Sequence, residues 1–413
     1  MKAETKQRIE QIRRGEVPEG YVKTALGLAP ANWKRYTFGD IYTERKEPGD
    51  ENLPLLMVSI HSGVSDGEVD AAELPKQVKR IEDKSQYKKA VSGDLVFNMM
   101  RAWQGAIGTV RTTGMVSPAY IVAEPNDKAY PLFMDYYSRT PQMINQIDRQ
   151  SYGVTDFRKR LYWDSFAPIS CTLPPIEEQQ KIATILTTQD RVIELKEKRL
   201  AEKQRQKKYL MQQLLTGKKR LPGFNGAWKT DCLGKLFFER KETNCENIEM
   251  LAITGTQGII PRKELDLKDN SSEDKSKYLR VCVGDIGYNT MRMWQGVSAY
   301  SNYEGIVSPA YTILKPSSSI NAKYFAYLFK MSEIVFLFYR FSQGLVDDTR
   351  NLKYENFKKI KVCYPPDMKE QTAIAEVLSA ADREIDLLQQ DIEQEKQKKK
   401  ALMQLLLTGI VRV

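Results

Sequence analysis

Apolar side chains recur at alternating spacings of four and three residues along two long stretches of this chain. Such heptad spacing is typical of a helix whose apolar seam pairs with another helix in a coiled coil. Both seams contain charged residues late in the helix, so neither suits a strong homodimer, and we predict that the two helices pair with each other. The seams consist of Ile182, Leu186, Gln189, Ile193, Lys196, Leu200, Lys203, Lys207, Leu210 and Leu214, and of Ile374, Leu378, Ala381, Ile385, Leu388, Ile392, Glu395, Lys399, Leu402 and Leu406.

Proline pairs and glycines in the sequence predict where both helices begin and end. Each follows a proline pair, at 174–175 and 365–366, and each ends at a Leu-Thr-Gly sequence, at 215–217 and 407–409. Proline favours a helix start, and glycine supplies the left-handed cap that ends a helix. A helix of about 33 residues rises about 50 Å, so we expect the pair to act as a spacer between globular domains.

The remaining sequence predicts short strands. Segments 34–173 and 223–364 are rich in β-branched and aromatic runs broken by Gly and Pro, such as 55–60 and 93–98. Helices are expected around 131–137 and 324–330. This mixture predicts an α/β (mixed α+β) domain of about 140 residues in each segment.

The chain is internally duplicated. The pattern Met-Arg-x-Trp-Gln-Gly at 100–105 returns at 291–296, and Val-Ser-Pro-Ala-Tyr at 116–120 returns at 307–311, both displaced by 191 positions. The helical segments follow at a displacement of 192. A repeat of this length indicates two similar domains in tandem, since solenoid repeats run about 20–50 residues. Two similar domains suggest two similar sites along one linear target.

The repeat gives the domain boundaries. We predict an N-terminal segment 1–33, a first globular domain 34–173, a first spacer helix with its linker 174–222, a second globular domain 223–364 and a second spacer helix 365–413. The first helix continues through 221–223 to Trp228, whereas the matching continuation of the second helix, 17–33, stands at the N-terminus. The order is therefore cyclic and pseudo-twofold.

Composition favours a polyanionic partner. Lys and Arg number 63 against 53 for Asp and Glu, giving a net charge of +10 and a pI near 9.1. The five cysteines form no Cys-x-x-Cys pair, and we interpret them as reduced thiols in a cytoplasmic protein. The sequence shows no apolar run of about 18 residues, so we expect neither export nor membrane insertion.

Catalytic chemistry has little support. The single histidine, His61, excludes a site with two histidine ligands, and a triad built on it would break the repeat. The nearest match to a phosphate-binding loop has Gln212 where the first glycine belongs and Lys219 in place of the hydroxyl residue. The proline pairs lack the leading Asn or Asp of amino-methyltransferase motifs. We expect a noncatalytic chain without a metal.

Binding residues are better represented. In both halves Arg, Trp and Gln fall within a few residues, and the candidates for DNA contact are Arg101, Gln104, Arg292 and Gln295. Arg grips guanine or phosphate, and Gln pairs with adenine. The alternative is structural, namely a hairpin with Trp103 and Trp294 in the core and a glycine that forces the turn. Both interpretations stay open at this point.

Further candidates flank these motifs. One basic stretch precedes the last strand of each domain and suits phosphate contact, although a solvated face is nearly as good an explanation. Its members are Tyr152, Arg158, Lys159 and Arg160 in the first half and Gln343, Arg350 and Lys353 in the second. Loops that differ between the halves suit two distinct half-sites, and they contribute His61, Ser62 and Lys76 against Thr256, Gln257 and Arg262.

Three motifs occur in both halves of the chain. They are Gly-Asp-x-x-x-Asn-x-Met-Arg-x-Trp-Gln-Gly, Val-Ser-Pro-Ala-Tyr and the Pro-Pro-x-x-Glu-Gln opening of each helix, the last loosely kept in the second half. Taken together, these motifs resemble the specificity subunit of type I restriction-modification systems, the HsdS family. The resemblance covers nearly the whole chain. It implies two target recognition domains that read the halves of a bipartite site in double-stranded DNA, and two conserved helices that pair as an antiparallel coiled coil, act as a ruler and dock two methyltransferase subunits.

The resemblance also implies where the chemistry resides. Methyltransferase partners would bind S-adenosylmethionine, and restriction subunits, where present, would use ATP and Mg²⁺, while this chain would hold no cofactor. Motifs shared by both halves are expected to be scaffold or backbone contacts. The rival hypotheses are a single-chain restriction-methylation enzyme, which no motif supports, and a coiled-coil adaptor without DNA specificity.

Overall fold

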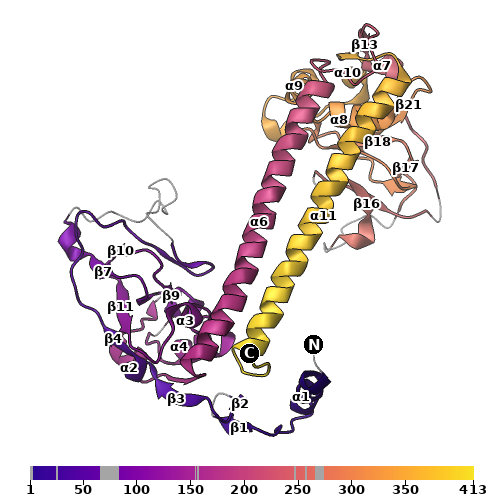
Figure 1. Cartoon of the computed structure of the whole chain (residues 1–413). Coiled ribbons are helices and arrows are strands. Elements are labelled where there is room, and N and C mark those ends of the chain that lie inside the picture. The colour runs from indigo at the N-terminus through magenta and orange to yellow at the C-terminus, as the bar shows by residue number, and fades with distance from the viewer. Residues whose placement is uncertain are drawn as a thin grey trace. The chain divides into compact units, whose positions relative to one another are not determined.

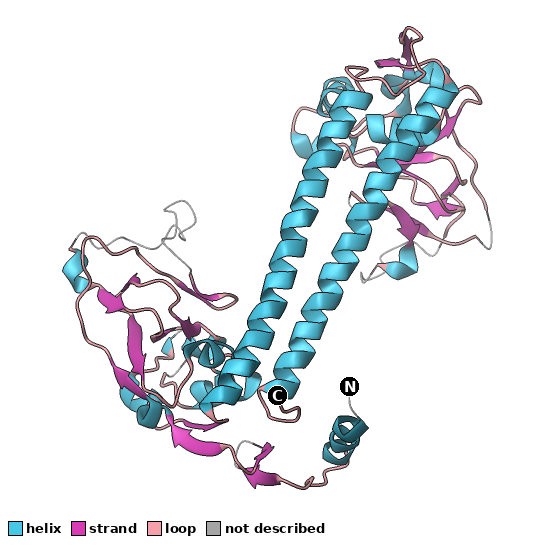
Figure 2. Ribbon diagram, in the orientation of Figure 1, coloured by secondary structure: helices cyan, strands magenta, loops and turns pink. Residues whose placement is uncertain are grey.

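The computed structural model describes residues 3–24, 27–65, 83–153, 155, 158–245, 248–255, 258–265 and 274–413, and it divides the chain into two compact units (Figure 1). Unit 1 comprises residues 1–195 with 392–413, and unit 2 comprises residues 196–391. The division falls within both long helices, so each unit contains one globular domain and part of each helix. Figure 2 shows that helices and strands occur in both units, which confirms the mixed α/β prediction.

Unit 1 places its globular domain before the first long helix. Its helical elements are α1 (Ala3–Arg13), α2 (Phe38–Ile41), η1 (Lys84–Gln86), η2 (Ala102–Gln104), α3 (Pro131–Tyr137), α4 (Pro141–Arg149) and α5 (Trp163–Phe166). Its strands are β1 (Tyr21–Thr24), β2 (Gly27–Pro30), β3 (Lys34–Thr37), β4 (Tyr42–Glu44), β5 (Val58–Ser59), β6 (Gly63–Val64), β7 (Lys88–Ala90), β8 (Leu95–Asn98), β9 (Ile107–Thr109), β10 (Gly114–Val116), β11 (Tyr120–Pro125) and β12 (Ser170–Leu173).

An antiparallel sheet in the order β4-β11-β8-β9 organises unit 1. Its central strand β8 buries side chains on both faces, so alternate residues enter different cores. Phe97 packs with Phe166, whose ring centroid lies 4.6 Å away, and Phe166 packs with Phe38 at 4.3 Å. Val96 faces a second cluster that includes Leu56. The sheet therefore sits between two apolar layers.

Unit 2 repeats this plan. Its helical elements are η4 (Arg262–Glu264), η5 (Met293–Gln295), η6 (Asp347–Thr349), α7 (Leu233–Leu236), α8 (Ala322–Leu328), α9 (Ser332–Phe341) and α10 (Tyr354–Phe357). Its strands are β13 (Lys229–Cys232), β14 (Phe237–Glu239), β15 (Leu251–Ile253), β16 (Ile259–Pro261), β17 (Leu279–Val281), β18 (Ile286–Asn289), β19 (Ser298–Tyr300), β20 (Gly305–Val307), β21 (Tyr311–Pro316) and β22 (Lys361–Tyr364). The sheet order β14-β21-β18-β19 is equivalent to that of unit 1.

Two long helices run through both units, α6 (Ile176–Leu214) and α11 (Met368–Leu406), each of 39 residues. Helix α6 begins directly after its proline pair and α11 one residue further on, and Gly217 and Gly409 follow their ends at φ +71°. At 1.5 Å per residue each helix is about 58 Å long. Within each unit the two helices lie side by side and run antiparallel (Figure 1).

Every seam position is buried or half-buried. The fully buried ones are Ile182, Leu186, Gln189, Ile193, Leu214, Ile374, Leu378, Ile385, Ile392 and Leu406. Leu200, Leu210, Ala381, Leu388 and Leu402 are half-buried, as are the charged positions Lys196, Lys203, Lys207, Glu395 and Lys399.

The charged seam positions meet opposite charges or polar groups across the seam. In unit 1 the Gln189 amide donates to Glu395 at 2.6 Å. In unit 2 Lys196 Nζ lies 2.8 Å from Asp391, and Lys203 Nζ lies 2.9 Å from Glu384. Because an unpaired charge at a half-buried position is costly, these contacts favour one register of the two helices.

A tyrosine-aspartate-lysine cluster joins the globular domain of unit 1 to the seam. The Tyr136 hydroxyl on α3 donates to Asp190 of α6 at 2.6 Å, and Lys399 of α11 lies 2.5 Å from the same carboxylate. Lys399 Nζ also lies 5.4 Å from the Tyr136 ring centroid. Burial, reinforced by the bond to Asp190, raises the pKa of Tyr136 well above its ordinary value.

Unit 2 contains the same cluster with the helices exchanged. The Tyr327 hydroxyl on α8 donates to Asp382 of α11 at 2.6 Å, and Lys207 of α6 pairs with that carboxylate. Lys207 Nζ lies 5.7 Å from the Tyr327 ring centroid. Each globular domain is therefore fixed to both helices by one charged cluster, which the sequence analysis did not identify.

The N-terminal segment occupies the end of α11 in unit 1, as the cyclic order predicts. The Tyr21 hydroxyl donates to the Gly409 carbonyl at 2.7 Å, and a Cβ on Gly409 would lie 2.5 Å from Pro30. Arg412 forms a bidentate bond with Glu178 at the start of α6, at 2.6 and 2.7 Å.

The corresponding contacts in unit 2 come from the linker that follows α6. Arg220 forms a bidentate bond with Glu370 at 2.5 and 2.7 Å, and Trp228 packs where a Cβ on Gly217 would stand. The displacement of 192 between Arg220 and Arg412 shows that chemically equivalent residues close both ends.

The remaining local predictions differ in detail. The helix expected around 131–137 is α3, and the one expected around 324–330 is α8, shifted toward the N-terminus. The basic stretches do not lead directly into the last strand, because the short helices α5 and α10 intervene. None of the helices among the described residues combines the length and apolar character needed to cross a bilayer.

We predict that Tyr136→Phe lowers the stability of unit 1 by about 1.5 kcal/mol, because it removes a hydrogen bond to a carboxylate while the ring is kept. Tyr327→Phe should act equally on unit 2. Urea unfolding measures both, with Tyr209→Phe as control, since Tyr209 is 57% exposed on α6. Equal losses in all three variants would contradict a specific role for the clusters.

Candidate nucleic-acid interface

A tight turn carries the Arg-Trp-Gln motif in each unit. In unit 1 the turn η2 joins the antiparallel strands β8 and β9, and in unit 2 the turn η5 joins β18 and β19. Gly105 and Gly296 close the turns with φ of +103° and +79°, a conformation that favours glycine. The predicted hairpin and the role of its glycine are therefore correct.

The tryptophans brace these turns but are not fully buried. Trp103 Nε1 donates to the Met100 carbonyl at 3.1 Å, and Trp294 Nε1 donates to the Met291 carbonyl at 3.0 Å. Both rings are half-buried, and the fully buried side chain of the turn is instead Ala102 in unit 1. Because the indole must be accommodated between turn and core, its contribution is structural, with one edge still accessible.

The polar members of the motif point to solvent. Arg101, Gln104, Arg292 and Gln295 are exposed, and neither arginine forms an ion pair with a described residue. Burial raises the pKa of Tyr120, the last residue of Val-Ser-Pro-Ala-Tyr, and the positive charge of Arg101 opposes this shift. The two repeated strings thus lie close together in unit 1.

The basic stretch of unit 1 lies beside the Trp turn. Lys159 Nζ stands 4.8 Å from the Trp103 ring centroid and pairs with Asp148 of α4 at 2.7 Å. A backbone bond of 2.8 Å from Leu161 to Met99 holds the stretch against the end of β8. The other three candidates differ in exposure: Tyr152 and Arg158 are exposed, and Arg160 is half-buried while its backbone bridges Tyr152.

Unit 2 places its basic stretch at the equivalent position with different chemistry. The Arg350 guanidinium stacks 4.1 Å from the Tyr339 ring centroid, and it donates to the Tyr339 hydroxyl and to Asp347, both at 2.9 Å. Tyr339 in turn packs edge-on against Trp294 at 6.2 Å. Gln343 and Lys353 are exposed.

The loop that carries His61 also reaches the Trp turn of unit 1. His61 and Ser62 are exposed in the turn between β5 and β6, a short hairpin where a loop was expected. The Ile60 carbonyl lies 3.5 Å from where a Cβ on Gly105 would stand. In unit 2 Arg262 begins η4. Partial burial raises the pKa of Tyr311, and the positive charge of Arg262 opposes this shift. Lys76, Thr256 and Gln257 lie outside the described residues.

The structure thus assembles one surface in each unit from segments that are far apart in sequence. Face 1 consists of His61, Ser62, Arg101, Gln104, Tyr152, Arg158 and Lys159, and face 2 consists of Arg292, Trp294, Gln295, Tyr339, Gln343, Arg350 and Lys353. The sequence analysis missed the contribution of α4 and α9, which supply Asp148 and Tyr339. The sequence repeat could have revealed these two residues, because they occupy equivalent positions of the two halves, 191 apart.

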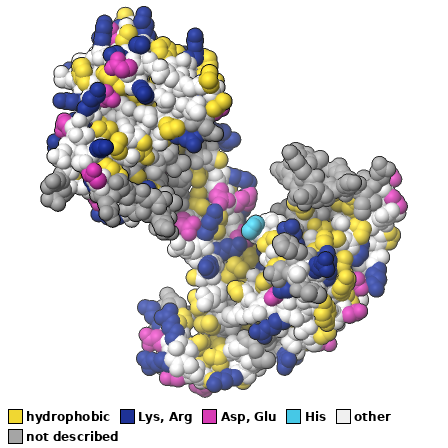
Figure 3. All heavy atoms as spheres, turned by 180° about the vertical axis from the view of Figure 1, so that it is seen from behind, with side chains coloured by type: hydrophobic (Ala, Val, Ile, Leu, Met, Phe, Trp, Pro, Cys, Tyr) yellow, Lys and Arg dark blue, Asp and Glu magenta, His cyan; other side chains and the backbone are white. Residues whose placement is uncertain are grey.

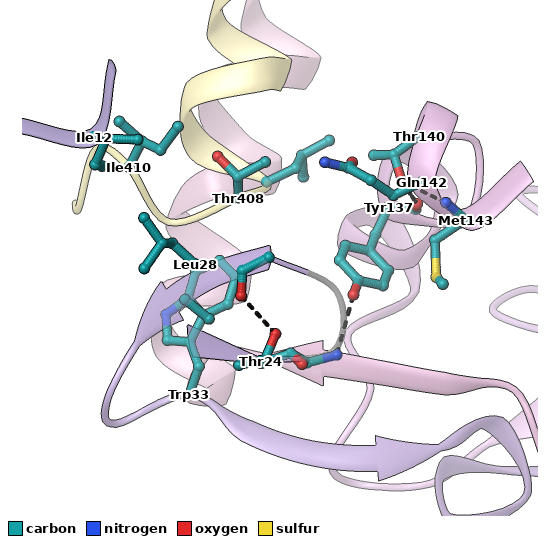
Figure 4. Close-up of a pocket in the computed structure, with 14 residues that line it drawn as sticks. Ile12, Thr24, Leu28, Trp33, Tyr137, Thr140, Gln142, Met143, Thr408 and Ile410 are labelled. Carbon is teal, nitrogen blue, oxygen red and sulfur yellow. Dashed lines mark hydrogen bonds between the residues drawn. The ribbon is translucent and has the colours of Figure 1, made fainter. Parts of the chain in front are cut away.

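The described part of the chain offers no cluster of metal-ligating side chains beside these faces. No group of three or more His, Cys, Asp or Glu side chains among the described residues could hold a metal ion. Figure 4 shows a cavity of about 200 Å³ in unit 1 where Leu28 and Trp33 of the N-terminal segment meet Tyr137, Met143 and the residues after α11. Its described lining holds no charged side chain, so it offers packing but no acid or base.

Positively charged side chains are not confined to faces 1 and 2. Figure 3 shows Lys and Arg side chains spread over the surface of both units with carboxylates between them. The distinguishing property of faces 1 and 2 is therefore the grouping of exposed Arg, Gln and aromatic side chains on a rigid turn, since basic residues alone occur elsewhere as well.

Comparison with known proteins agrees with this architecture. The family model of the type I restriction modification DNA specificity domain matches residues 72–205 and again 234–397, more than half of the chain. A curated protein of Methanocaldococcus jannaschii, named as the type I restriction enzyme MjaX specificity subunit, is 23% identical over 96% of this chain and 97% of its own length.

Two solved structures share the fold. The type I restriction-modification S subunit of M. genitalium aligns with a TM-score of 0.55 at 12% identity, over 91% of this chain and 96% of that one. A chain from a structural study of assembly and conformational transition in the type I system aligns with a TM-score of 0.52 at 17% identity, over 93% and 99%. Specificity subunits are noncatalytic, and catalysis in type I systems resides in partner subunits. The chain therefore belongs to this family and is a noncatalytic specificity subunit of a type I restriction-modification system.

Proposed function

We propose that each unit reads one half of an asymmetric bipartite site in double-stranded DNA, and that α6 and α11 set the gap between the halves and dock methyltransferase subunits in the cytoplasm. The observation that carries the proposal is the repeated surface: the same Trp turn and basic stretch in both units, surrounded by different side chains. A shared scaffold with different neighbours suits two half-sites of different sequence.

The arginines of the turns suit phosphate contact. Arg101 and Arg292 are exposed and identical in the two units, so a base preference carried by them would be the same in both half-sites. Phosphate contacts carry no sequence information, which fits a shared residue. Residues that differ between the faces, such as Asp148 and Tyr339, suit direct or indirect control of base preference.

The outer surfaces of the helices suit protein partners. Leu195 is 50% exposed and Leu387 is 65% exposed, and they occupy equivalent positions 192 apart. An apolar side chain at the same exposed position of each helix fits two copies of one partner. We propose two methyltransferase subunits there, which would supply S-adenosylmethionine, with restriction subunits that use ATP and Mg²⁺ joining them where present.

Sequencing of adenine methylation tests the proposal directly. Cells that express this chain with its methyltransferase should show a motif of two short half-sites around a fixed gap, absent with the methyltransferase alone. Soluble, associated proteins without a new motif would favour the coiled-coil adaptor. The salt dependence of binding also separates the DNA-reading proposal from the adaptor alternative. For a DNA-binding protein, the logarithm of the binding constant falls with the logarithm of the salt concentration at a slope of about −0.9 per phosphate neutralised.

We predict that Arg101→Ala combined with Arg292→Ala weakens binding to cognate and random duplexes alike and lowers the salt slope by about 2, one for each phosphate contact. Fluorescence anisotropy at several salt concentrations measures both quantities. Arg35→Ala with Arg205→Ala is a charge-matched control in which one exposed arginine comes from each unit and neither belongs to face 1 or face 2. A loss restricted to the cognate duplex would assign the arginines to base reading instead.

We also predict that one extra heptad in each helix, inserted after Leu195 and after Asp391, lengthens the gap by about three base pairs. Seven residues add about 10 Å and keep the seam in phase, and a base pair rises about 3.4 Å. Methylation sequencing reads the new gap. An insertion in only one helix serves as the mismatched control, and an unchanged gap with both insertions would refute the spacer role.

A further inference from the structure

Face 2 is bordered by apolar side chains that the fold leaves uncovered. Leu345 is 99% exposed, Val346 is 59% exposed and Phe336 is 58% exposed. The Phe336 ring stacks on Tyr339 at 6.4 Å, so Phe336 is continuous with the aromatic contacts around Trp294, and Arg350 links Tyr339 to Asp347 in the loop of Leu345 and Val346. Grouped apolar surface of this kind marks an interaction site more often than isolated exposed residues do.

The loop that presents Leu345 has a defined internal structure. Gln343 and Asn351 exchange two backbone hydrogen bonds of 2.8 Å and close the loop. The Thr349 hydroxyl donates to the Val346 carbonyl at 2.9 Å. Gly344 has φ +126°, and a Cβ there would lie 2.6 Å from the Thr349 carbonyl oxygen. The exposed tip is therefore held outward by its own backbone, and the exposure is a property of the fold.

The charge around this tip favours nucleic acid over a protein as the occupant. Arg292, Arg340 and Lys353 are exposed and form no ion pair with any described residue. Arg350 at the base of the loop, beside Tyr339, is balanced by its ion pair with Asp347, so Arg292, Arg340 and Lys353 supply the net positive charge. An apolar tip within a positive rim suits a ligand with a negatively charged backbone and apolar groups between, which describes a DNA groove.

Face 1 keeps an aliphatic residue at the position of Leu345, because Val154 stands there outside the described residues, and it differs at the other corresponding positions. Asn145 and Asp148 replace Phe336 and Tyr339, and Thr155 replaces Val346. The two faces therefore offer different chemistry on the same scaffold.

We propose that Leu345 and Val346 read thymine in the half-site of unit 2 by contact with its 5-methyl group. This inference rests on the proposed function. The thymine methyl is the apolar group that base pairs present in the major groove, and an exposed aliphatic tip is its chemical complement. Leu345 and Val346 belong to unit 2, so this inference concerns the half-site of unit 2.

Adenine-methylation sequencing gives the first test. With the methyltransferase present, Leu345→Ser combined with Val346→Ser should relax base preference at one or two A·T pairs of one half-site, while the other half-site and the gap stay unchanged. Val283→Ser is the matched control, since Val283 is 63% exposed in the same unit at the opposite end of β18. Relaxation in both half-sites, or an unchanged motif, would overturn the assignment.

Thymine-to-uracil duplexes give the second test, because this replacement removes only the methyl group. Wild-type complex should bind the uracil duplex about 3- to 10-fold more weakly at the relaxed position, the value of burying one methyl group, and the double variant should bind both duplexes equally. Equal binding by the wild type would overturn the methyl contact. Loss of methyltransferase co-purification in the variant would instead assign the tip to a protein partner. Failure of the proposed function is distinguishable, since the wild type would then yield no bipartite motif.

Discussion

Charge pairing along the seam of α6 and α11 is the constraint on which the rest of the structure depends. Lys196 and Lys203 occupy half-buried positions of α6 where an apolar residue would pack better, and each meets a carboxylate of α11. Removing one partner from such a pair leaves an uncompensated charge, so a helix slipped by one turn would strand several charges at once. The charged seam residues lower the stability of the helix pair but favour a single register, as polar seam residues do in other coiled coils.

That register also fixes the recognition domains, because the charged clusters use the same seam. Asp190 accepts bonds from Tyr136 of the globular domain and from Lys399 of the opposite helix. A shift of either helix would separate the lysine from the tyrosine. The orientation of each globular domain within its own unit therefore depends on the helix contacts as well as on the sheet.

Local sequence was sufficient to predict some of this organisation and insufficient for the rest. Heptad spacing, proline pairs and the glycines at 217 and 409 act over a few residues, and the helix limits follow from them. The position of Lys159 over Trp103 depends on a loop that returns from α4, about 55 residues later. The burial of the tryptophans was overestimated, because the core beneath each turn is filled by Ala102 or Met293. Such contacts follow from tertiary packing and have no signature in residue spacing.

The two properties expected of this protein, base preference and gap length, depend on separate parts of each unit. The loop around Leu345 is held by bonds within residues 343–351 and by Arg350 on Tyr339, none of which involves α6 or α11. The seam pairs, conversely, involve no residue of faces 1 or 2. Energetic effects of groups without shared partners add independently. Changes in the loops can therefore alter which bases are preferred without disturbing the helix register, and this separation is what a scaffold with variable specificity requires.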